Sequence, residues 1–195
     1  QIIEGDKVLK VQGTAAQLKP GKEKKLYVAN AGTAARFITA ILSLSDESFY
    51  ISGNSYMNKR PFDGLLDVLS RLGVSFQYSQ KDLCTPFFIK GKSSLETAGL
   101  ELAVSCEKSS QFLSALLMLA PLCSHGLTLL FDKNLVSAPY VSMTLGMMEK
   151  FGVSHKKIPG GVRIEKSSYK SCDYEVEVDY SSASYFLALA AIHQS

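Results

Sequence analysis

Three segments of the chain share one pattern of small and apolar positions. Each opens on glycine, serine or threonine and continues directly into a stretch rich in alanine, leucine and aromatic residues: Gly32–Leu42, Ser109–Met118 and Ser181–Ala190. The spacing of the apolar positions predicts an α-helix in each segment. Because apolar residues lie nearly all round each predicted helix, we expect all three helices to be buried.

Two further segments share a second pattern. Apolar residues at helical spacing follow Pro61-Phe62 and end before Gly73, and the same arrangement runs from Pro139-Tyr140 to Gly152. A proline in the first turn and a glycine just past the last turn are typical of the two ends of a helix. Each segment therefore predicts a helix with one buried face.

Short runs of β-type residues fill the intervals between these helices. The elements then repeat in the order strand, helix, strand, helix, strand, strand, and Thr33 precedes Ser110 by 77 residues, as Ser110 precedes Ser182 by 72. A period of this kind indicates a repeated structural unit, with two whole units and the start of a third in this chain. The predicted strands are Ser48–Ser52, Val74–Tyr78, Pro86–Lys90, Leu100–Val104, Leu127–Phe131, Val153–Lys157, Val162–Glu165 and Tyr174–Val178.

The repeat predicts an α+β fold built from α/β-type units. We expect a single domain over residues 1–195, in which βαβαββ units are arranged with pseudo-threefold symmetry. The three apolar helices would then lie inside a ring of sheets. No change of composition marks a boundary within the chain.

Composition and charge exclude several functional classes. Of the 195 residues, 46% are hydrophobic and 20% are charged, and the net charge is +3. This charge is too small to suggest nucleic-acid binding, and no apolar run reaches the roughly 18 residues that a membrane-spanning helix needs. The four cysteines and three histidines lack the spacing of metal ligands, so we expect no metal site and free thiols in a cytoplasmic protein.

The two ends of the chain suggest a fragment of a longer protein. Residue 1 is glutamine, no signal-peptide pattern follows it, and the chain stops soon after an apolar segment that ends at Ile192. We therefore expect further sequence in the parent protein.

Four candidate sites lie where predicted helices begin: Asn30–Arg36, Lys59–Pro61, Ser109–Gln111 and Ser137–Tyr140. The free backbone N–H groups of a helix start attract anions, and arginine adds a charged fork. Each segment also has a purely structural interpretation, as a helix cap or a helix-entry turn. The repeat would bring all four to one side of the domain, which favours an anion-binding surface. The chain carries no P-loop, no G-x-G-x-x-G and no recognisable Ser-His-Asp or Cys-His pairing.

Five motifs follow one another along the chain. They are Asn30-Ala31-Gly32-Thr33-Ala34-x-Arg36, Gly53-x-x-x-Met57-x-x-Arg60-Pro61, Ser109-Ser110-Gln111-Phe112-Leu113-Ser114-Ala115-Leu116-Leu117-Met118, Ser137-x-Pro139-Tyr140-x-x-x-Thr144-Leu145 and Asp179-x-Ser181-Ser182-Ala183-Ser184-Tyr185-Phe186-Leu187-Ala188. In this order they resemble the motifs of the 5-enolpyruvylshikimate-3-phosphate (EPSP) synthase family.

The resemblance implies an enzyme that transfers the enolpyruvyl group of phosphoenolpyruvate to shikimate 3-phosphate and releases phosphate. It implies two similar domains, each one half of an inside-out α/β barrel, that close over the substrates without a metal or organic cofactor. This chain would be the shikimate-3-phosphate-binding domain, and the second domain would be absent from it. Because the acid and base groups would come mostly from that second domain, the chain alone would bind substrate without turnover.

The resemblance also implies roles for individual residues. Those implied to bind shikimate 3-phosphate are Ser109, Ser110, Gln111, Ser137 and Tyr140. Those implied to bind phosphoenolpyruvate are Asn30, Gly32, Thr33, Arg36, Arg60 and again Gln111. Asp179 would lie near the hinge between the domains.

Two alternatives stay open. A UDP-N-acetylglucosamine enolpyruvyltransferase shares this fold and chemistry, although it lacks the combined motifs that begin at Ser109 and Ser137. An isolated, non-catalytic anion-binding domain would present the same helix starts. Departures from the family pattern, such as Ala138 and Tyr180, remove no substrate ligand but leave open whether glyphosate inhibits the protein.

Overall fold

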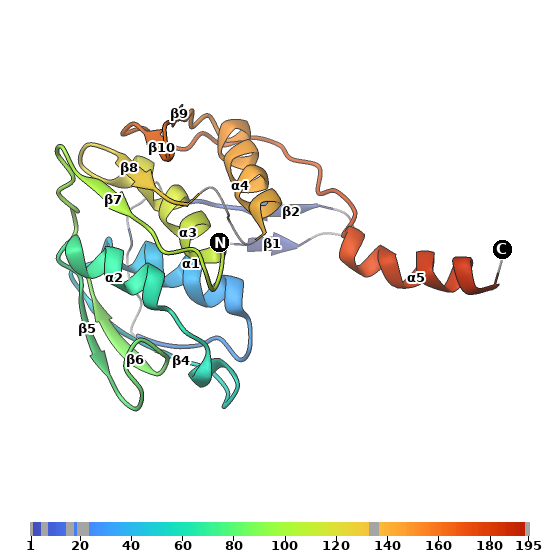
Figure 1. Ribbon diagram of the computed structural model, residues 1–195, viewed down its shortest axis with the longest axis horizontal. Helices are drawn as coiled ribbons and strands as arrows, with labels where there is room; N and C mark the ends of the chain where they lie inside the picture. Colours follow the sequence, from blue (N-terminus) through green and yellow to red (C-terminus); the bar gives the residue numbers. More distant parts are fainter. Residues whose placement is uncertain (1, 5–7, 15–17, 19–23, 133–136, 194–195) are drawn as a thin grey trace.

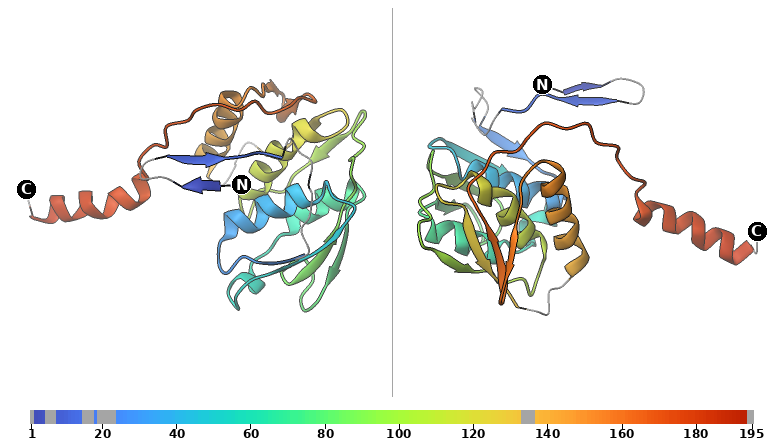
Figure 2. Two further views of the ribbon diagram at one scale, coloured as in Figure 1. Left: turned by 180° about the vertical axis from the view of Figure 1, so that it is seen from behind. Right: turned by 90° about the horizontal axis from the view of Figure 1, so that it is seen from above.

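The computed structural model describes residues 2–4, 8–14, 18, 24–132 and 137–193 (Figure 1). Two four-stranded sheets and the helices between them form a body, and one helix projects from this body at its C-terminal end (Figures 1 and 2). A two-stranded antiparallel hairpin, β1 (Ile2–Glu4) with β2 (Leu9–Val11), precedes the body. These two strands are not among the predicted ones.

The first unit contains one complete copy of the predicted order of elements. Its sheet has the strand order β3-β4-β6-β5, in which β3 and β4 are parallel and the other pairs antiparallel. The elements are β3 (Lys25–Tyr27), α1 (Gly32–Leu42), β4 (Ser48–Ser52), the short 3-10 helix η1 (Met57–Lys59), α2 (Asp63–Arg71), β5 (Ser75–Tyr78) and β6 (Phe87–Lys90).

The second unit repeats this topology. Its sheet has the order β7-β8-β10-β9, again with one parallel pair, β7 with β8, and two antiparallel pairs. The shared strand order confirms the predicted α+β fold of βαβαββ units. The elements are β7 (Glu101–Ala103), α3 (Gln111–Leu119), the 3-10 helix η2 (Ala120–Leu122), β8 (Leu127–Leu130), α4 (Ala138–Lys150), β9 (Lys156–Ile158) and β10 (Gly161–Ile164).

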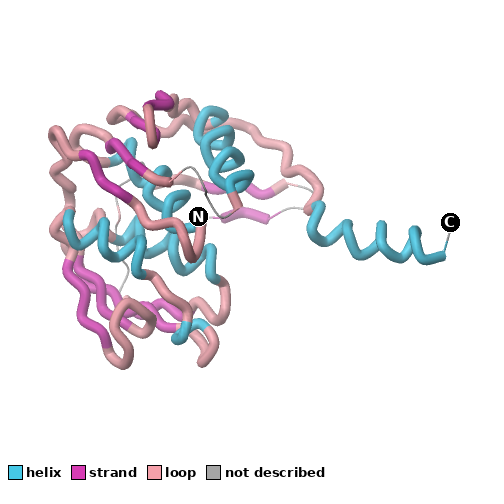
Figure 3. Tube along the Cα trace, in the orientation of Figure 1, coloured by secondary structure: helices cyan, strands magenta, loops and turns pink. Residues whose placement is uncertain are grey.

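Helix α3 lies at the centre of the body (Figure 3). It packs against α1, α2, α4 and β8, and its residues 112–117 are all buried. Helix α1 in turn packs on β4 and β6. The first two of the three apolar stretches predicted to form buried helices therefore join the two sheets through the α1–α3 contact.

The expected start of α2 is corrected by the structure. The helix begins at Asp63, so Pro61 lies before its first turn rather than in it. Two hydrogen bonds account for this: the Phe62 amide donates to the Leu83 carbonyl oxygen (2.9 Å), and Arg36 donates to the Pro61 carbonyl oxygen (2.8 Å). These bonds hold the residues ahead of the helix in contact with the rest of the first unit.

The second proline helix follows the prediction more closely. Pro139 lies in the first turn of α4, and Gly152 follows the helix with a φ of 81°. The strand expected from Val153 begins only at Lys156, because the Val153 amide donates to the Met148 carbonyl oxygen (2.9 Å) and closes the helix end.

The third apolar segment forms a helix, but its expected burial is wrong. Helix α5 (Tyr180–His193) projects from the body, and Phe186 and Leu187 are 73% and 66% exposed (Figures 1 and 2). The strand expected over Tyr174–Val178 does not form, and Val176 is 84% exposed. A strand needs a neighbour for its backbone groups and an apolar helix needs a packing partner. The described residues supply neither beside these two segments.

All four cysteines are free, as predicted, and Cys172 alone among them is exposed. Burial raises the pKa of Cys123 to about 12, and burial also raises the pKa of Cys106 to about 11. The described thiols in the core therefore behave as apolar side chains rather than as reactive groups.

Candidate functional site

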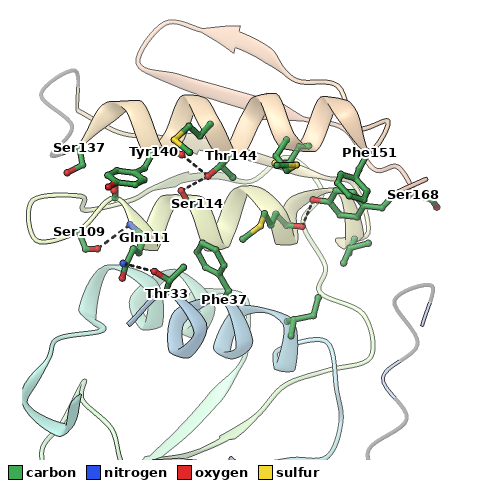
Figure 4. Close-up of a pocket in the computed structure, with 18 of the residues that line it drawn as sticks. Thr33, Phe37, Ser109, Gln111, Ser114, Ser137, Tyr140, Thr144, Phe151 and Ser168 are labelled. Atoms are coloured by element: carbon green, nitrogen blue, oxygen red, sulfur yellow. Dashed lines mark hydrogen bonds between the residues drawn. The ribbon is translucent and has the colours of Figure 1, made fainter. Parts of the chain in front are cut away.

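A cavity of about 1110 Å³ lies between α1, α3 and α4 (Figure 4). At one end, Ser109, Gln111, Ser137 and Tyr140 gather near Thr33, so this end is polar (Figure 4). The rest of the cavity is mainly apolar. The cavity as a whole is also lined by Thr14, Leu18, Phe37, Ile41, Lys108, Ser110, Ser114, Met118, Leu122, Met143, Thr144, Met147, Met148, Phe151, Ser168 and Tyr169.

The start of α3 supplies two serines to the polar end. Ser110 is the residue before the helix and is only 6% exposed, yet its hydroxyl makes no capping hydrogen bond. The Ser109 hydroxyl accepts a hydrogen bond from the Gln111 amide (3.2 Å). Because a capping role does not occupy the Ser110 hydroxyl, this group is available to a ligand beside the helix start.

The start of α4 supplies Ser137 and Tyr140. Ser137 has φ 60° and ψ 44°, the left-handed region that non-glycine residues rarely adopt, and it too makes no side-chain cap. Tyr140 is 58% exposed, so its ring is open to solvent at the cavity. The Thr144 hydroxyl donates to the Tyr140 carbonyl oxygen (2.8 Å) and lies 2.9 Å from the Ser114 hydroxyl, which joins α4 to α3 (Figure 4).

Gln111 connects α3 to α1. Its Nε2 donates to the Thr33 Oγ1 (3.0 Å), and its Oε1 is buried without a partner among the described residues (Figure 4). A buried amide oxygen without a donor is costly, so this atom is a candidate acceptor for a ligand group.

Two arginines meet at Gly32, immediately before Thr33. A Cβ atom placed on Gly32 would lie 2.7 Å from Arg60 Nη1 and 2.8 Å from Arg36 Nη1. The Arg60 side chain donates to the Asn30 carbonyl oxygen (3.3 Å). Only glycine leaves room for both guanidinium groups at this position, and together with the α1 start they form a cationic cluster.

Arg36 itself is a buried residue, 2% exposed. Its guanidinium donates to the carbonyl oxygens of Gly32 (3.0 Å) and Pro61 (2.8 Å) and lies 4.6 Å from the centre of the Phe62 ring. Burial and the neighbouring charge of Arg60 lower the pKa of Arg36 to about 10. The structure therefore places Arg36 beneath the cluster rather than on its surface.

The structure thus divides the residues that the sequence analysis selected into two groups. Those that line the cavity are Thr33, Ser109, Ser110, Gln111, Ser137 and Tyr140. Those that form the cationic cluster beyond it are Asn30, Gly32, Arg36 and Arg60. The Gln111–Thr33 hydrogen bond connects the two groups.

Asp179 does not line the cavity. It precedes α5, where its carboxylate accepts a hydrogen bond from the Ser182 hydroxyl (2.7 Å) and its carbonyl oxygen accepts one from the Ala183 amide (2.9 Å). In this structure Asp179 caps a helix, and its expected place near a hinge stays a prediction.

Sequence reasoning gave no site role to several polar residues that line the cavity, among them Lys108 and Tyr169. Lys108 forms an ion pair with Asp63 and immediately precedes Ser109. A basic residue directly before two serines is a sequence signal that could have marked it. Tyr169 comes from an irregular segment after β10, and no sequence signal marks it. Its hydroxyl donates to the Met118 carbonyl oxygen (2.9 Å), and the loss of solvent around this group raises the pKa of Tyr169 to about 12.

The described lining residues include no carboxylate and no histidine. In the same part of the chain, no group of three or more histidine, cysteine, aspartate or glutamate side chains could hold a metal ion. No helix among the described residues has the length and apolar character to cross a membrane. The polar groups that line the cavity are hydroxyls, the Gln111 amide and the Lys108 ammonium, which are suited to bind and orient an anion.

The chain is similar to known proteins along its whole length. The family model for EPSP synthase (3-phosphoshikimate 1-carboxyvinyltransferase) matches residues 1–195. The chain is 39% identical over 185 residues to the 3-phosphoshikimate 1-carboxyvinyltransferase of Colwellia psychrerythraea, which covers 93% of this chain and 43% of that protein. It is 38% identical over 186 residues to the pentafunctional AROM polypeptide of Malassezia globosa, covering 87% of this chain and 11% of that one.

Solved structures share the fold. The EPSP synthase from Acinetobacter baumannii superposes with a TM-score of 0.73 at 22% identity, covering 89% of this chain and 37% of that chain. The present chain spans less than half the length of the single-enzyme relatives that it matches.

Proposed function

Because the chain belongs to the EPSP synthase family, we propose that the protein containing it transfers the enolpyruvyl group of phosphoenolpyruvate to shikimate 3-phosphate and releases phosphate. Residues 1–195 would form the shikimate-3-phosphate-binding domain, and a second domain of the same polypeptide would complete the enzyme. The observation that carries this proposal is the polar end of the cavity, where serines from two helix starts surround one space.

The serines form the proposed phosphate subsite. Ser109, Ser110 and Ser137 would donate their hydroxyls to the phosphate of shikimate 3-phosphate, and the starts of α3 and α4 add favourable helix dipoles. The exposed ring of Tyr140 would cover one side of the shikimate ring, while Gln111 would lie between the two substrates.

The cationic cluster forms the proposed phosphoenolpyruvate subsite. This substrate carries a carboxylate and a phosphate, and the Arg60 guanidinium suits either because it presents parallel N–H donors. Gly32 leaves room for the ligand beside Arg60, with Asn30, Thr33 and Arg36 around them. Glyphosate, which carries a carboxylate and a phosphonate, would compete for the same subsite.

The proposed reaction is an addition followed by an elimination. A proton is added to the methylene carbon of phosphoenolpyruvate, and a hydroxyl of shikimate 3-phosphate attacks the adjacent carbon and loses its own proton. The tetrahedral intermediate then loses phosphate together with one proton from the new methyl group, so that the double bond re-forms. Since no carboxylate or histidine lines the described cavity, the proton-transfer groups would belong to the second domain. This chain alone would bind substrate without turnover, in the cytoplasm, where free thiols are the rule.

The proposal is tested by calorimetric titration of this chain and of the full-length polypeptide with shikimate 3-phosphate. UDP-N-acetylglucosamine serves as the comparison ligand, and phosphate release is measured in parallel. The proposal is supported if shikimate 3-phosphate binds saturably to either protein, and if the full-length polypeptide releases phosphate whereas this chain does not. Binding of the sugar nucleotide only would favour a UDP-N-acetylglucosamine enolpyruvyltransferase. Phosphate release by this chain alone would contradict its role as a binding half-site.

A further inference from the structure

Arg36 is a buried cation that makes no ion pair within the described part of the chain. Such a charge is expensive to bury unless polar groups and ring faces replace its water. Here two carbonyl oxygens accept from its guanidinium, and the rings of Phe62 and Phe112 lie 4.6 Å and 5.6 Å from its central carbon. These contacts leave its N–H groups turned to the protein, with Nε buried and unpartnered.

The two carbonyl oxygens belong to separate segments. One is that of Gly32, at the start of α1, and the other is that of Pro61, which directly follows Arg60. The planar guanidinium thus spans 25 residues of sequence and joins the segment that carries Gly32 to the segment that carries Arg60. A lysine could carry the charge but could not hold both carbonyls in this fixed geometry.

We propose that Arg36 is a positioning residue for the phosphoenolpyruvate subsite, which fixes the Arg60 guanidinium against Gly32 and does not itself contact the substrate. This inference rests on the proposed function and refines the role of Arg36 in it. It accounts for an arginine that is buried at the cluster, bonded to backbone on both sides and close to a second arginine despite their like charges.

The test uses Arg36→Lys in the full-length polypeptide. We expect the KM for phosphoenolpyruvate, at saturating shikimate 3-phosphate, to rise about tenfold to a hundredfold because charged hydrogen bonds are lost. The Kd for shikimate 3-phosphate, measured by calorimetry, should change less than about twofold, since the hydrogen bonds of Arg36 go to Gly32 and Pro61 and not to the serines of the phosphate subsite. Arg163→Lys is the matched control: it removes a comparable guanidinium-to-carbonyl bond, to His125 (2.8 Å), in the second unit.

The double variant with Arg60→Lys separates positioning from direct contact. If Arg36 acts through Arg60, the double variant raises the KM no more than the more damaging single variant does. Additive effects would mean that Arg36 touches the substrate, and equal loss of both ligands would mean that it only supports the fold. Either result overturns the inference.

A second variant covers the case in which Arg36→Lys does not fold. Phe62→Leu removes one ring from the guanidinium and keeps both carbonyl bonds, so a smaller rise of the same KM is expected, with shikimate 3-phosphate binding unchanged. The inference is contradicted if the KM for phosphoenolpyruvate does not rise, or if the Kd for shikimate 3-phosphate rises with it. If the unaltered polypeptide neither binds shikimate 3-phosphate nor consumes phosphoenolpyruvate, the proposed function fails before this comparison begins.

Discussion

Single residues at the starts of α3 and α4 show how this site is built. Serine before a helix usually spends its hydroxyl on a backbone amide of the first turn. Neither Ser110 nor Ser137 makes such a bond, and Ser110 is nevertheless buried. A serine that lines a cavity and does not use its hydroxyl for capping can offer that hydroxyl to a ligand, and this is the argument from single residues for a phosphate subsite.

Ser110→Ala should lower the affinity of this chain for shikimate 3-phosphate. A hydrogen bond to a charged phosphate contributes about 1.5–3 kcal/mol, which corresponds to roughly tenfold to a hundredfold in Kd. The melting temperature should stay unchanged, because the Ser110 hydroxyl makes no capping hydrogen bond that the substitution could remove. Calorimetric titration measures the affinity, and Ser75→Ala is the control, since that exposed hydroxyl bonds to the Lys90 carbonyl oxygen away from the cavity. An unchanged Kd would assign Ser110 a structural role.

Arg60→Ala should weaken the binding of phosphoenolpyruvate much more than the binding of shikimate 3-phosphate. Its guanidinium faces Gly32, not the serines of the cavity, and its loss removes charged hydrogen bonds that contribute about 1.5–3 kcal/mol. The full-length polypeptide gives both constants, from steady-state kinetics and from calorimetry. Losses of equal size for the two substrates would refute the division into two subsites.

Thiol chemistry gives a residue-scale test of burial. A thiol reacts as its thiolate, and a raised pKa keeps the neutral form dominant to higher pH. At pH 9, Cys106 and Cys123, with pKa values of about 11 and about 12, should therefore resist iodoacetamide, while the exposed Cys172 is alkylated. Mass spectrometry of the labelled native chain identifies the sites, and labelling in denaturant is the positive control. Rapid labelling of Cys123 in the native chain would mean that the core opens.

Sequence reasoning selected the residues at the polar end of the cavity and those of the cationic cluster, but it did not predict how deeply each is buried. Ser109, Ser110 and Gln111 could be found because hydroxyl and amide side chains before an apolar helix form a local pattern. The burial of Arg36 could not, since it depends on Phe112, which lies 76 positions later in the sequence and belongs to the second unit. Long-range packing of this kind leaves no local signal.

The same contrast holds for whole elements. Helices α3 and α5 have similar apolar sequences, and yet α3 is enclosed by three helices and a strand whereas α5 projects from the body (Figure 1). Periodicity predicted both helices correctly, because helix formation reflects residues three and four positions apart. It could not predict burial, because burial depends on whether a partner lies alongside.

A matched pair of leucines tests this difference between elements. Leu116 of α3 is fully buried, and Leu116→Ala should lower the free energy of unfolding by about 2–5 kcal/mol. Leu187 of α5 is 66% exposed, and Leu187→Ala should change the free energy of unfolding by less than about 0.5 kcal/mol. Urea denaturation of the two variants of this chain measures both. Similar losses would show that α5 packs on the body in solution.

At the scale of the whole molecule, the two units act as one binding body. The cavity takes its walls from α1 of the first unit and from α3 and α4 of the second, and the units meet through the α1–α3 contact. Residues 174–193 contribute nothing to the lining described here. The binding body therefore ends with the segment that carries Tyr169.

Deleting residues 174–195 should leave this body intact. The shortened chain keeps Tyr169 with its bond to Met118, and keeps the Lys170 amide that donates to the Phe151 carbonyl oxygen. We expect the same melting temperature within about 2 °C, since surface changes rarely exceed about 0.5 kcal/mol, and the same Kd for shikimate 3-phosphate. Differential scanning calorimetry and titration check both. A large fall in either would show that α5 supports the site.

The left-handed backbone of Ser137 has a consequence for protein evolution. Glycine adopts φ 60° without the steric cost that serine bears, so selection for thermal stability alone favours glycine at this position. That change would also delete the hydroxyl facing the cavity. Serine at this position therefore lowers the stability of the fold and supplies a hydroxyl for ligand binding, so we expect selection for heat tolerance alone to accept glycine here.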